Sequence, residues 1–400
     1  MQTIYLDHNA TSPIHPEVLE AMSRCWAQGL ANSASQHRPG QQARRELDDA
    51  RDRVAAVLDI DLSSNQDRLI FTSGGTEANN LAILGIAQAG PPCTPVSGSQ
   101  AAGGTKTGPS RIVISAGEHQ SVIEPAEHLL EQGWRMDTLG LTPQGVVCVD
   151  QLTPLLTRDT RLVSVLLANH ETGVLQPIEE LAARCNALSI PLHTDAIQAV
   201  GKMPVSFRRL GVAAMSVAAH KFGGPLGIGA LAVRRDVVVA PLMFGGHQQA
   251  GLRPGTEPVA LAVGMAVALE RAQKEQAESA RRLAGLRDRF EQSLRNALPC
   301  VIINGIEAAR LSQTSSVAFM GLDGEVLRMA LDLAGVACSV GAACSSGSTE
   351  LSPTLRAMQL PKERVASSLR FSLGATTTQA EIDAAVCRIA QVCRELCDLP

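Results

Sequence analysis

The stretch RLIFTSGGTEANNLAILGIAQ, residues 68–88, shows the pattern that decides the fold of this chain. A continuous apolar run leads through a glycine-rich turn into a segment of helical character. Further apolar runs follow at 111–115, 161–168, 214–218 and 228–234, and helical segments lie between them at 122–132 and 177–188. Apolar runs without polar alternation are typical of strands buried on both faces. Their alternation with helices predicts an α/β fold with a mostly parallel sheet flanked by helices.

The segments outside this core predict a second, smaller domain. Strands are expected at 301–303, 314–319 and 368–373, and helices at 16–30, 40–58, 257–297, 324–334 and 379–396. Short strands mixed with helices in the last third of the chain are typical of an α+β domain. We therefore expect a large domain formed by residues 16–260, and a small α+β domain formed by residues 261–400 together with residues 1–15.

Composition argues against several classes of function. The 400 residues are 45% hydrophobic and 18% charged, with a net charge of −4, which does not fit a general nucleic-acid binder. The sequence shows neither a secretory signal nor an apolar run near the ~20 residues of a membrane span. Its 10 cysteines are scattered and form no Cys-x-x-Cys pair. This usage suits a reducing, cytoplasmic compartment, and no cysteine spacing indicates a resident metal.

The turn at 74–76 in the opening stretch is a candidate phosphate site. A Gly-Gly-Thr turn at a helix N-terminus offers backbone N–H groups and a hydroxyl to an anion. It is neither a P-loop nor the Gly-x-Gly-x-x-Gly dinucleotide pattern. Taken alone, the turn fits an ordinary strand–helix connection equally well.

Lys221 and Asp195 are the other candidates from the residues themselves. Lys221 is one of only five lysines; it ends an apolar run, and His220 and two glycines flank it. Burial lowers the pKa of an amine and makes the neutral nucleophile accessible, although a lone lysine here is more often a strand-end residue. Asp195 follows a short buried strand, with Gln198 three residues later. Both should lie with Lys221 and the glycine turn at the carboxyl edge of the sheet.

Together these groups match what pyridoxal phosphate requires. The turn would hold the phosphate, the carboxylate would keep the ring nitrogen protonated so that the ring accepts electrons, and the lysine would hold the cofactor as an imine. Cys344 is a further candidate, because it lies in the small-residue segment SVGAACSSGSTELSP, residues 339–353. An isolated cysteine in such a segment also fits a small residue in a flexible loop.

The chain resembles the cysteine desulfurases of the class V aminotransferase group, which have fold type I of the pyridoxal-phosphate enzymes. The resemblance covers nearly the whole chain. The segments that carry it are YLDHNATSP (5–13), NSASQHRPG (32–40), FTSGGTEANNLAI (71–83), GEHQSV (117–122), NHETGVLQPI (169–178), HTDAIQAVGK (193–202), AHKFGGPLGIGAL (219–231), GLRPGTEP (251–258) and SLRFSLG (368–374). The segment around Cys344 resembles the subgroup with a long, mobile catalytic-cysteine loop.

The resemblance implies a role for each of several residues. Lys221 corresponds to the lysine that binds the cofactor, His119 to the histidine that stacks on its ring and relays protons, and Cys344 to the nucleophile that becomes the persulfide. Asp195 corresponds to the carboxylate at the ring nitrogen and Gln198 to the donor at the phenolic oxygen. The remaining implied contacts are Gly75, Thr76 and His220 to the phosphate, Thr256 to the phosphate of the second subunit, Asn169 to cofactor and substrate, and Arg370 to the substrate carboxylate.

The implied activity is that of a homodimeric enzyme that removes sulfur from L-cysteine. It would leave L-alanine and a persulfide on Cys344 for a sulfur-acceptor protein, such as an iron–sulfur scaffold or a tRNA-thiolation factor. Cys344 is also a candidate ligand of a transient iron–sulfur cluster. Alternatives are a selenocysteine lyase or an aminotransferase on the same scaffold, a cofactor-free scaffold protein, and a phosphate-binding module.

Three features depart from the family pattern. Ala218 stands where the family usually has a serine that contacts the phosphate, so one hydroxyl is missing unless Ser216 or a water compensates. Residues 89–110, rich in glycine, proline, serine and threonine, form a longer insertion than usual and are expected to be a surface loop. The sequence stops at Pro400, directly after the last expected helix, and this leaves the sulfur acceptor open.

Overall fold

A seven-stranded sheet forms the centre of the protein. The computed structural model describes residues 3–29, 31–63, 67–89, 109–341 and 351–397. The strands of the sheet lie in the order β2-β8-β7-β6-β5-β3-β4. Their bounds are β2 Arg68–Thr72, β3 Arg111–Ser115, β4 Arg135–Leu139, β5 Thr160–Ser164, β6 Leu192–Asp195, β7 Ala214–Ala218 and β8 Gly229–Val233. Neighbours are parallel except at β8, which is antiparallel to β2 and β7. The prediction of a mostly parallel sheet is confirmed.

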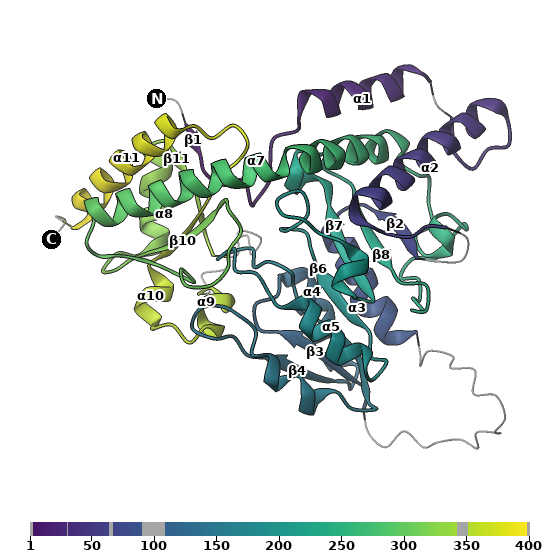
Figure 1. Ribbon diagram of the computed structural model, residues 1–400, viewed down its shortest axis with the longest axis horizontal. Helices are drawn as coiled ribbons and strands as arrows, with labels where there is room; N and C mark the ends of the chain where they lie inside the picture. The colour runs from purple at the N-terminus through teal and green to yellow at the C-terminus, as the bar shows by residue number, and fades with distance from the viewer. Residues whose placement is uncertain (1–2, 30, 64–66, 90–108, 342–350, 398–400) are drawn as a thin grey trace.

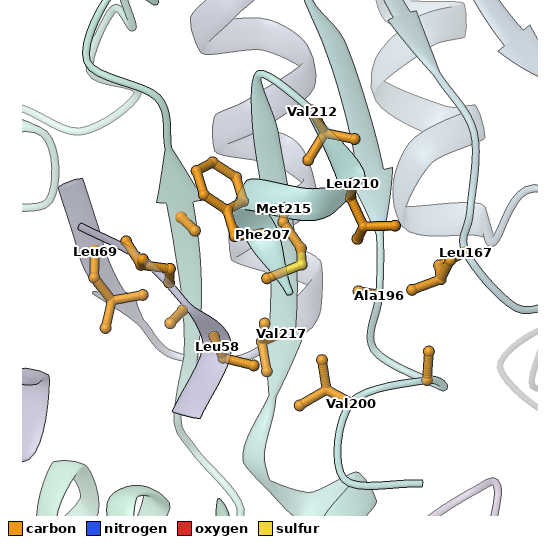
Figure 2. Packing of buried hydrophobic residues seen from close by; sticks show 14 of the residues in the cluster. Leu58, Leu69, Leu167, Ala196, Val200, Phe207, Leu210, Val212, Met215 and Val217 are labelled. Carbon is orange, nitrogen blue, oxygen red and sulfur yellow. The ribbon is translucent and has the colours of Figure 1, made fainter. Parts of the chain in front are cut away.

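Helices cover both faces of this sheet (Figure 1). They are α1 Pro16–Ala27, α2 Arg38–Leu58, α3 Gly75–Gln88, α4 Gln120–Glu131, α5 Ile178–Asn186, α6 Phe207–Leu210 and α7 Val259–Ala297. Successive strand residues point to opposite faces, so Ile70 and Ile112 pack with α3 and α4 while Phe71 and Val113 pack with the other helices. Figure 2 shows part of the second cluster, where Phe207 lies near Met215.

A second hydrophobic core lies at the far end of α7 (Figure 1). An antiparallel sheet of order β12-β13-β10-β9 forms its centre, and β1 pairs with β11 beside it. The elements are β1 Ile4–Tyr5, β9 Val301–Ile303, β10 Thr314–Phe319, α8 Gly324–Leu333, β11 Val336–Ala337, β12 Ser339–Val340, α9 Pro353–Ala357, α10 Lys362–Ala366, β13 Ser368–Ser372 and α11 Gln379–Cys397. Helix α7 contributes buried side chains to both cores, Met265 to the first and Phe290 to the second. The division into residues 16–260 and 261–400 stays a prediction.

The structure differs from the sequence expectations at two strands. The expected strand at 161–168 ends at Ser164. Beyond it the amides of Val165 and Leu167 still donate to carbonyls of β6, but the amide of Leu166 donates to the side chain of Glu118. Strand β4 was not expected; its residues are exposed or half-buried except Leu139, as at the edge of a sheet, and they form no apolar run. Most of the expected loop at 89–110 lies outside the described residues.

The remaining short elements of the described ranges are the 3-10 helices η1 Val149–Gln151, η2 Thr153–Leu155, η3 Ala219–Phe222 and η4 Gln249–Gly251. Among the described residues, no helix has both the length and the apolar character that crossing a bilayer requires. The described part of the chain also contains no cluster of three or more histidine, cysteine or acidic side chains that could bind a metal ion.

Candidate active site

A cavity of about 270 Å³ lies at the edge of the sheet where β2, β3, β6 and β7 end. These strands all point the same way, so the segments that follow them meet at this edge. The cavity brings together seven of the predicted site residues: Gly75, Thr76, His119, Asp195, Gln198, His220 and Lys221. Ala218, His170 and Ala10 also line it.

The predicted phosphate turn forms the start of α3. Gly74 is the N-cap residue and provides no side-chain oxygen, so the first N–H groups of the helix have no side-chain cap. A Cβ on Gly75 would lie 2.2 Å from Cδ1 of Ile197, so glycine is needed for this close approach. A helix N-terminus of this kind favours an anion.

Asp195 is held rigidly at the end of β6. Its Oδ1 accepts from the amide of Ile197 at 2.9 Å, and its Oδ2 accepts from Nδ2 of Asn79 at 2.7 Å. The same Asn79 amide donates to Oγ of Ser121. The residue is only 7% exposed, so the carboxylate has a fixed orientation in a site with little water.

Two histidines lie together on the wall of the cavity. His119 is the N-cap of α4, where its Nδ1 accepts from the amide of Ser121, and its ring makes an edge contact with His170 at a centroid distance of 5.3 Å. Burial, and after it the neighbouring His119, holds the pKa of His170 well below its usual value. Burial also lowers the pKa of His220 to about 4, with further contributions from Lys221 and Lys202. His170 and His220 are therefore uncharged at neutral pH.

The N-terminal segment passes directly beside the predicted cofactor lysine. Nζ of Lys221 donates to the carbonyl oxygens of Asn9 at 2.6 Å and Ala10 at 2.7 Å. Nε2 of Gln198 donates to the same Asn9 oxygen at 3.0 Å. The amine and the amide therefore meet at one backbone carbonyl.

The two predicted substrate-binding residues are not among the residues that line the cavity. Arg370, on β13, forms an ion pair with Asp7 at 2.8 Å and donates from Nη1 to the carbonyl of His170 at 3.1 Å. Its Nε is buried without a hydrogen-bond partner among the described residues. Asn169 donates to the carbonyl of Gly117 and accepts from the amides of Glu171 and Thr172, so it stabilises its own turn.

Three further sequence predictions have different outcomes. Thr256 is exposed and lines a separate surface cavity with Trp26 and Asn32, so one chain does not bring it to the site. Cys344 lies outside the described residues. Ser216 does not replace the hydroxyl missing at Ala218. The Oγ of Ser216 is hydrogen-bonded to Nε2 of His193 in the interior of the sheet.

The residues around the cavity fit pyridoxal phosphate. An anion site at an uncapped helix N-terminus, a fixed carboxylate and a primary amine line one cavity, and uncharged imidazoles line it beside them. When bound, this cofactor supplies an electron-accepting ring to an amine substrate. Lys221, Asp195, Gln198 and the turn at 74–76 are the residues that would hold it.

The reasoning from individual residues missed some groups that shape this site. Asn79, which orients Asp195, lies inside α3 and has no sequence signal that points to a partner 116 residues away. Asn9 and Ala10 act through backbone carbonyls, which leave no side-chain signature. Their segment, YLDHNATSP, was found only through the family resemblance.

Comparison with known proteins agrees with this geometry. Residues 4–385 match the model of the class-V aminotransferase family. The cysteine desulfurase IscS of Dictyoglomus turgidum is 38% identical over 95% of this chain and 92% of its own length. An IscS-like cysteine desulfurase of Mycobacterium tuberculosis is 40% identical over 96% of this chain and 94% of its own length.

Solved structures show the same fold. A NifS-like protein from Rickettsia africae has a TM-score of 0.85 and 28% identity, covering 98% of this chain and 99% of its own. Another NifS-like protein has a TM-score of 0.87 and 30% identity, covering 98% of this chain and 100% of its own. The chain belongs to the class-V aminotransferases, a pyridoxal-phosphate-dependent family, and within it to the group of the cysteine desulfurases.

Proposed function

We propose that this protein is a cysteine desulfurase that converts L-cysteine to L-alanine and transfers the sulfur to Cys344. The observation that carries the proposal is the cavity in which Lys221, Asp195, His119 and the uncapped N-terminus of α3 meet. The cysteine desulfurases among the relatives, 38% and 40% identical over nearly the whole chain, support the choice of substrate.

Each residue of the cavity has a task in this proposal. Lys221 would hold the cofactor through its amine and would take the proton from Cα of the substrate. Asp195 would accept a hydrogen bond from the ring nitrogen, and its two fixed donors keep it oriented for this. His119, which lines the same cavity, would stack on the ring. Arg370 binds the substrate carboxylate through Nε, which is the donor left without a partner in the structure.

The sulfur transfer balances without an external oxidant. The Cys344 thiol gives up its proton and attacks the sulfur of the substrate, so the C–S bond breaks and an S–S bond forms. The electron pair of the broken bond stays with the carbon skeleton, which takes up the one proton given up by the Cys344 thiol and leaves as alanine. The hydrogen of the substrate thiol stays on the outer sulfur of the persulfide. A sulfur-acceptor protein then takes the outer sulfur of the persulfide.

A homodimer in the cytoplasm completes the proposal. Thr256 lies at a surface cavity where Trp26 is 58% exposed, and Phe244 is 86% exposed nearby in the sequence. Apolar side chains at such exposure favour a protein interface, through which Thr256 would reach the phosphate of a second subunit. The described cysteines are all free, which suits a reducing compartment.

The test is persulfide formation on purified holoenzyme. With L-cysteine and no added thiol, we expect one alanine per active site and a mass increase of one sulfur on the peptide that contains Cys344. Cys344→Ser should retain the colour of the bound cofactor and lose both products. Cys387→Ser is the matched control, because Cys387 is exposed on α11.

Several results would contradict the proposal. Alanine formation in Cys344→Ser equal to the wild type would exclude Cys344 as the acceptor. Turnover with selenocysteine and little with cysteine would indicate a selenocysteine lyase. Alanine formation that requires a keto acid would indicate an aminotransferase, and a colourless protein that does not bind the cofactor would indicate a scaffold protein.

A further inference from the structure

Lys202 is a half-buried lysine that the proposed mechanism does not use. It follows β6, and its amine end is enclosed. Its Nζ donates to Oε1 of Gln198 at 2.8 Å and contacts Oδ1 of Asn9 at 3.5 Å. Both of these partners are neutral amide oxygens.

The charged surroundings of Lys202 are unfavourable for a lysine. Among the described residues no carboxylate forms an ion pair with it. The titratable groups that act on it are Lys221 and His220 on η3, Arg370 on β13 and His8 on the N-terminal segment. His15, Arg271 and Glu275 line the same cavity as Lys202 and form no ion pair with it among the described residues. Burial, and after it Lys221 and Arg370, holds the pKa of Lys202 well below its usual value. An apolar side chain of similar length would avoid this desolvation cost, so stability does not explain the lysine.

The contact with Gln198 gives Lys202 a different task. The N–H of the Lys202 amine donates to the Gln198 amide, so the Gln198 atom that faces Nζ is the oxygen Oε1. The Nε2 end of the same amide is thereby fixed on the other side. There it donates to the Asn9 carbonyl, which also accepts from Nζ of Lys221. Lys202 therefore decides which end of the Gln198 amide lies beside the cofactor lysine.

We propose that Lys202 is a positioning residue of the cofactor site, which holds the Gln198 amide so that its N–H end faces the cavity and donates to the phenolic oxygen of the cofactor. This inference rests on the proposed function. With Lys202 absent, the amide can turn its carbonyl toward the cavity, where it would repel the phenolic oxygen. An N–H donor stabilises that oxygen most when it carries the greatest negative charge, which is when the lysine–cofactor link is deprotonated. Losing the donor therefore raises the pH at which the link titrates.

The experiment is a pH titration of the visible absorbance of the holoenzyme. For Lys202→Met we expect the midpoint to rise by about one pH unit. Gln198→Ala should raise it similarly, and adding Lys202→Met to Gln198→Ala should produce less than half of the shift seen in the wild-type background. Lys202→Arg should keep the wild-type midpoint, because it keeps the donor and because Lys202 lines a separate cavity of about 200 Å³ that has space for the longer side chain.

Controls separate positioning from other effects. Lys274→Met removes an exposed lysine from α7 and should leave the midpoint unchanged. Lys202→Leu gives the same comparison if the methionine variant does not fold. An unchanged midpoint in Lys202→Met overturns the inference, as does a full shift in the Gln198→Ala background, which would mean that Lys202 acts through its charge alone. If the wild-type protein itself has no titrating visible band, the proposed function fails instead.

Discussion

The Asp7→Asn substitution tests how the predicted substrate-binding arginine is held in place. The side chains of Arg370 and Asp7 are only 4% and 16% exposed, and Nη2 and Oδ1 are 2.8 Å apart. Removing one charge of a buried pair costs about 3–5 kcal/mol, because the other charge stays buried without compensation. We expect the lower end of this range, about 3 kcal/mol, since asparagine can still accept from Oγ of Ser339.

The assay is urea unfolding of the cofactor-free protein at one fixed protein concentration. Asp7→Asn should lower the unfolding midpoint clearly and also raise the KM for cysteine more than it lowers kcat, because Arg370 loses its orientation. The double variant Asp7→Asn/Arg370→Met should recover part of the stability, since it leaves no buried charge. Asp383→Asn is the matched control. The side chains of Arg289 and Asp383 are 46% and 42% exposed, so loss of their ion pair should not measurably move the unfolding midpoint.

Two results would refute this reasoning. The first is an unfolding midpoint of Asp7→Asn equal to that of Asp383→Asn, which would mean that the buried pair contributes no more than an exposed one. The second is a double variant less stable than Asp7→Asn, which would mean that the uncompensated charge of Arg370 is not the source of the loss.

Three further predictions concern the cavity and the cores. Gly75→Ala should weaken retention of pyridoxal phosphate in equilibrium dialysis, because the new Cβ would lie 2.2 Å from Cδ1 of Ile197; unchanged retention would count against the close approach. Burial raises the pKa of Glu118 to about 8, so its contribution to stability is complete below the pKa of the unfolded chain and is lost as the pH rises through 8. Glu118→Gln should therefore gain stability relative to the wild type between pH 5 and 9 in urea titrations, and a constant difference would contradict the shift. Phe371→Ala, at a fully buried position, should cost about 3–5 kcal/mol of unfolding free energy, and a loss under about 1 kcal/mol would show that the second core collapses around the gap.

The sheet could be predicted from sequence because its strands are buried on both faces. The runs at 111–115 and 214–218 are apolar throughout, and the structure places strands β3 and β7 at these positions. Strand β4 escaped this reasoning since an edge strand needs no continuous apolar run. Strands β1, β11 and β12 have two residues each, too few to show any periodicity.

The site could be predicted in part, for a reason that lies in the topology. The carboxyl ends of parallel strands meet at one edge, so the positions of Asp195 and Lys221 after their strands were enough to place them together. No comparable rule predicts contacts between segments that are distant in the sequence. Arg370 and Asp7 are 363 residues apart, and neither sequence segment shows that the arginine is already paired. The interactions of Asn79 and Lys202 depend in the same way on the packed structure.

The central claim is that Lys221 holds the cofactor, and reduction of the holoenzyme with borohydride followed by peptide mapping tests it most directly. Lys202 makes the test sharp, because its amine contacts the side chain of Asn9, the residue whose backbone carbonyl accepts from Nζ of Lys221. The account predicts a pyridoxyl group on the peptide that contains Lys221 and none on Lys202. A pyridoxyl group on Lys202, or on neither lysine, would contradict it.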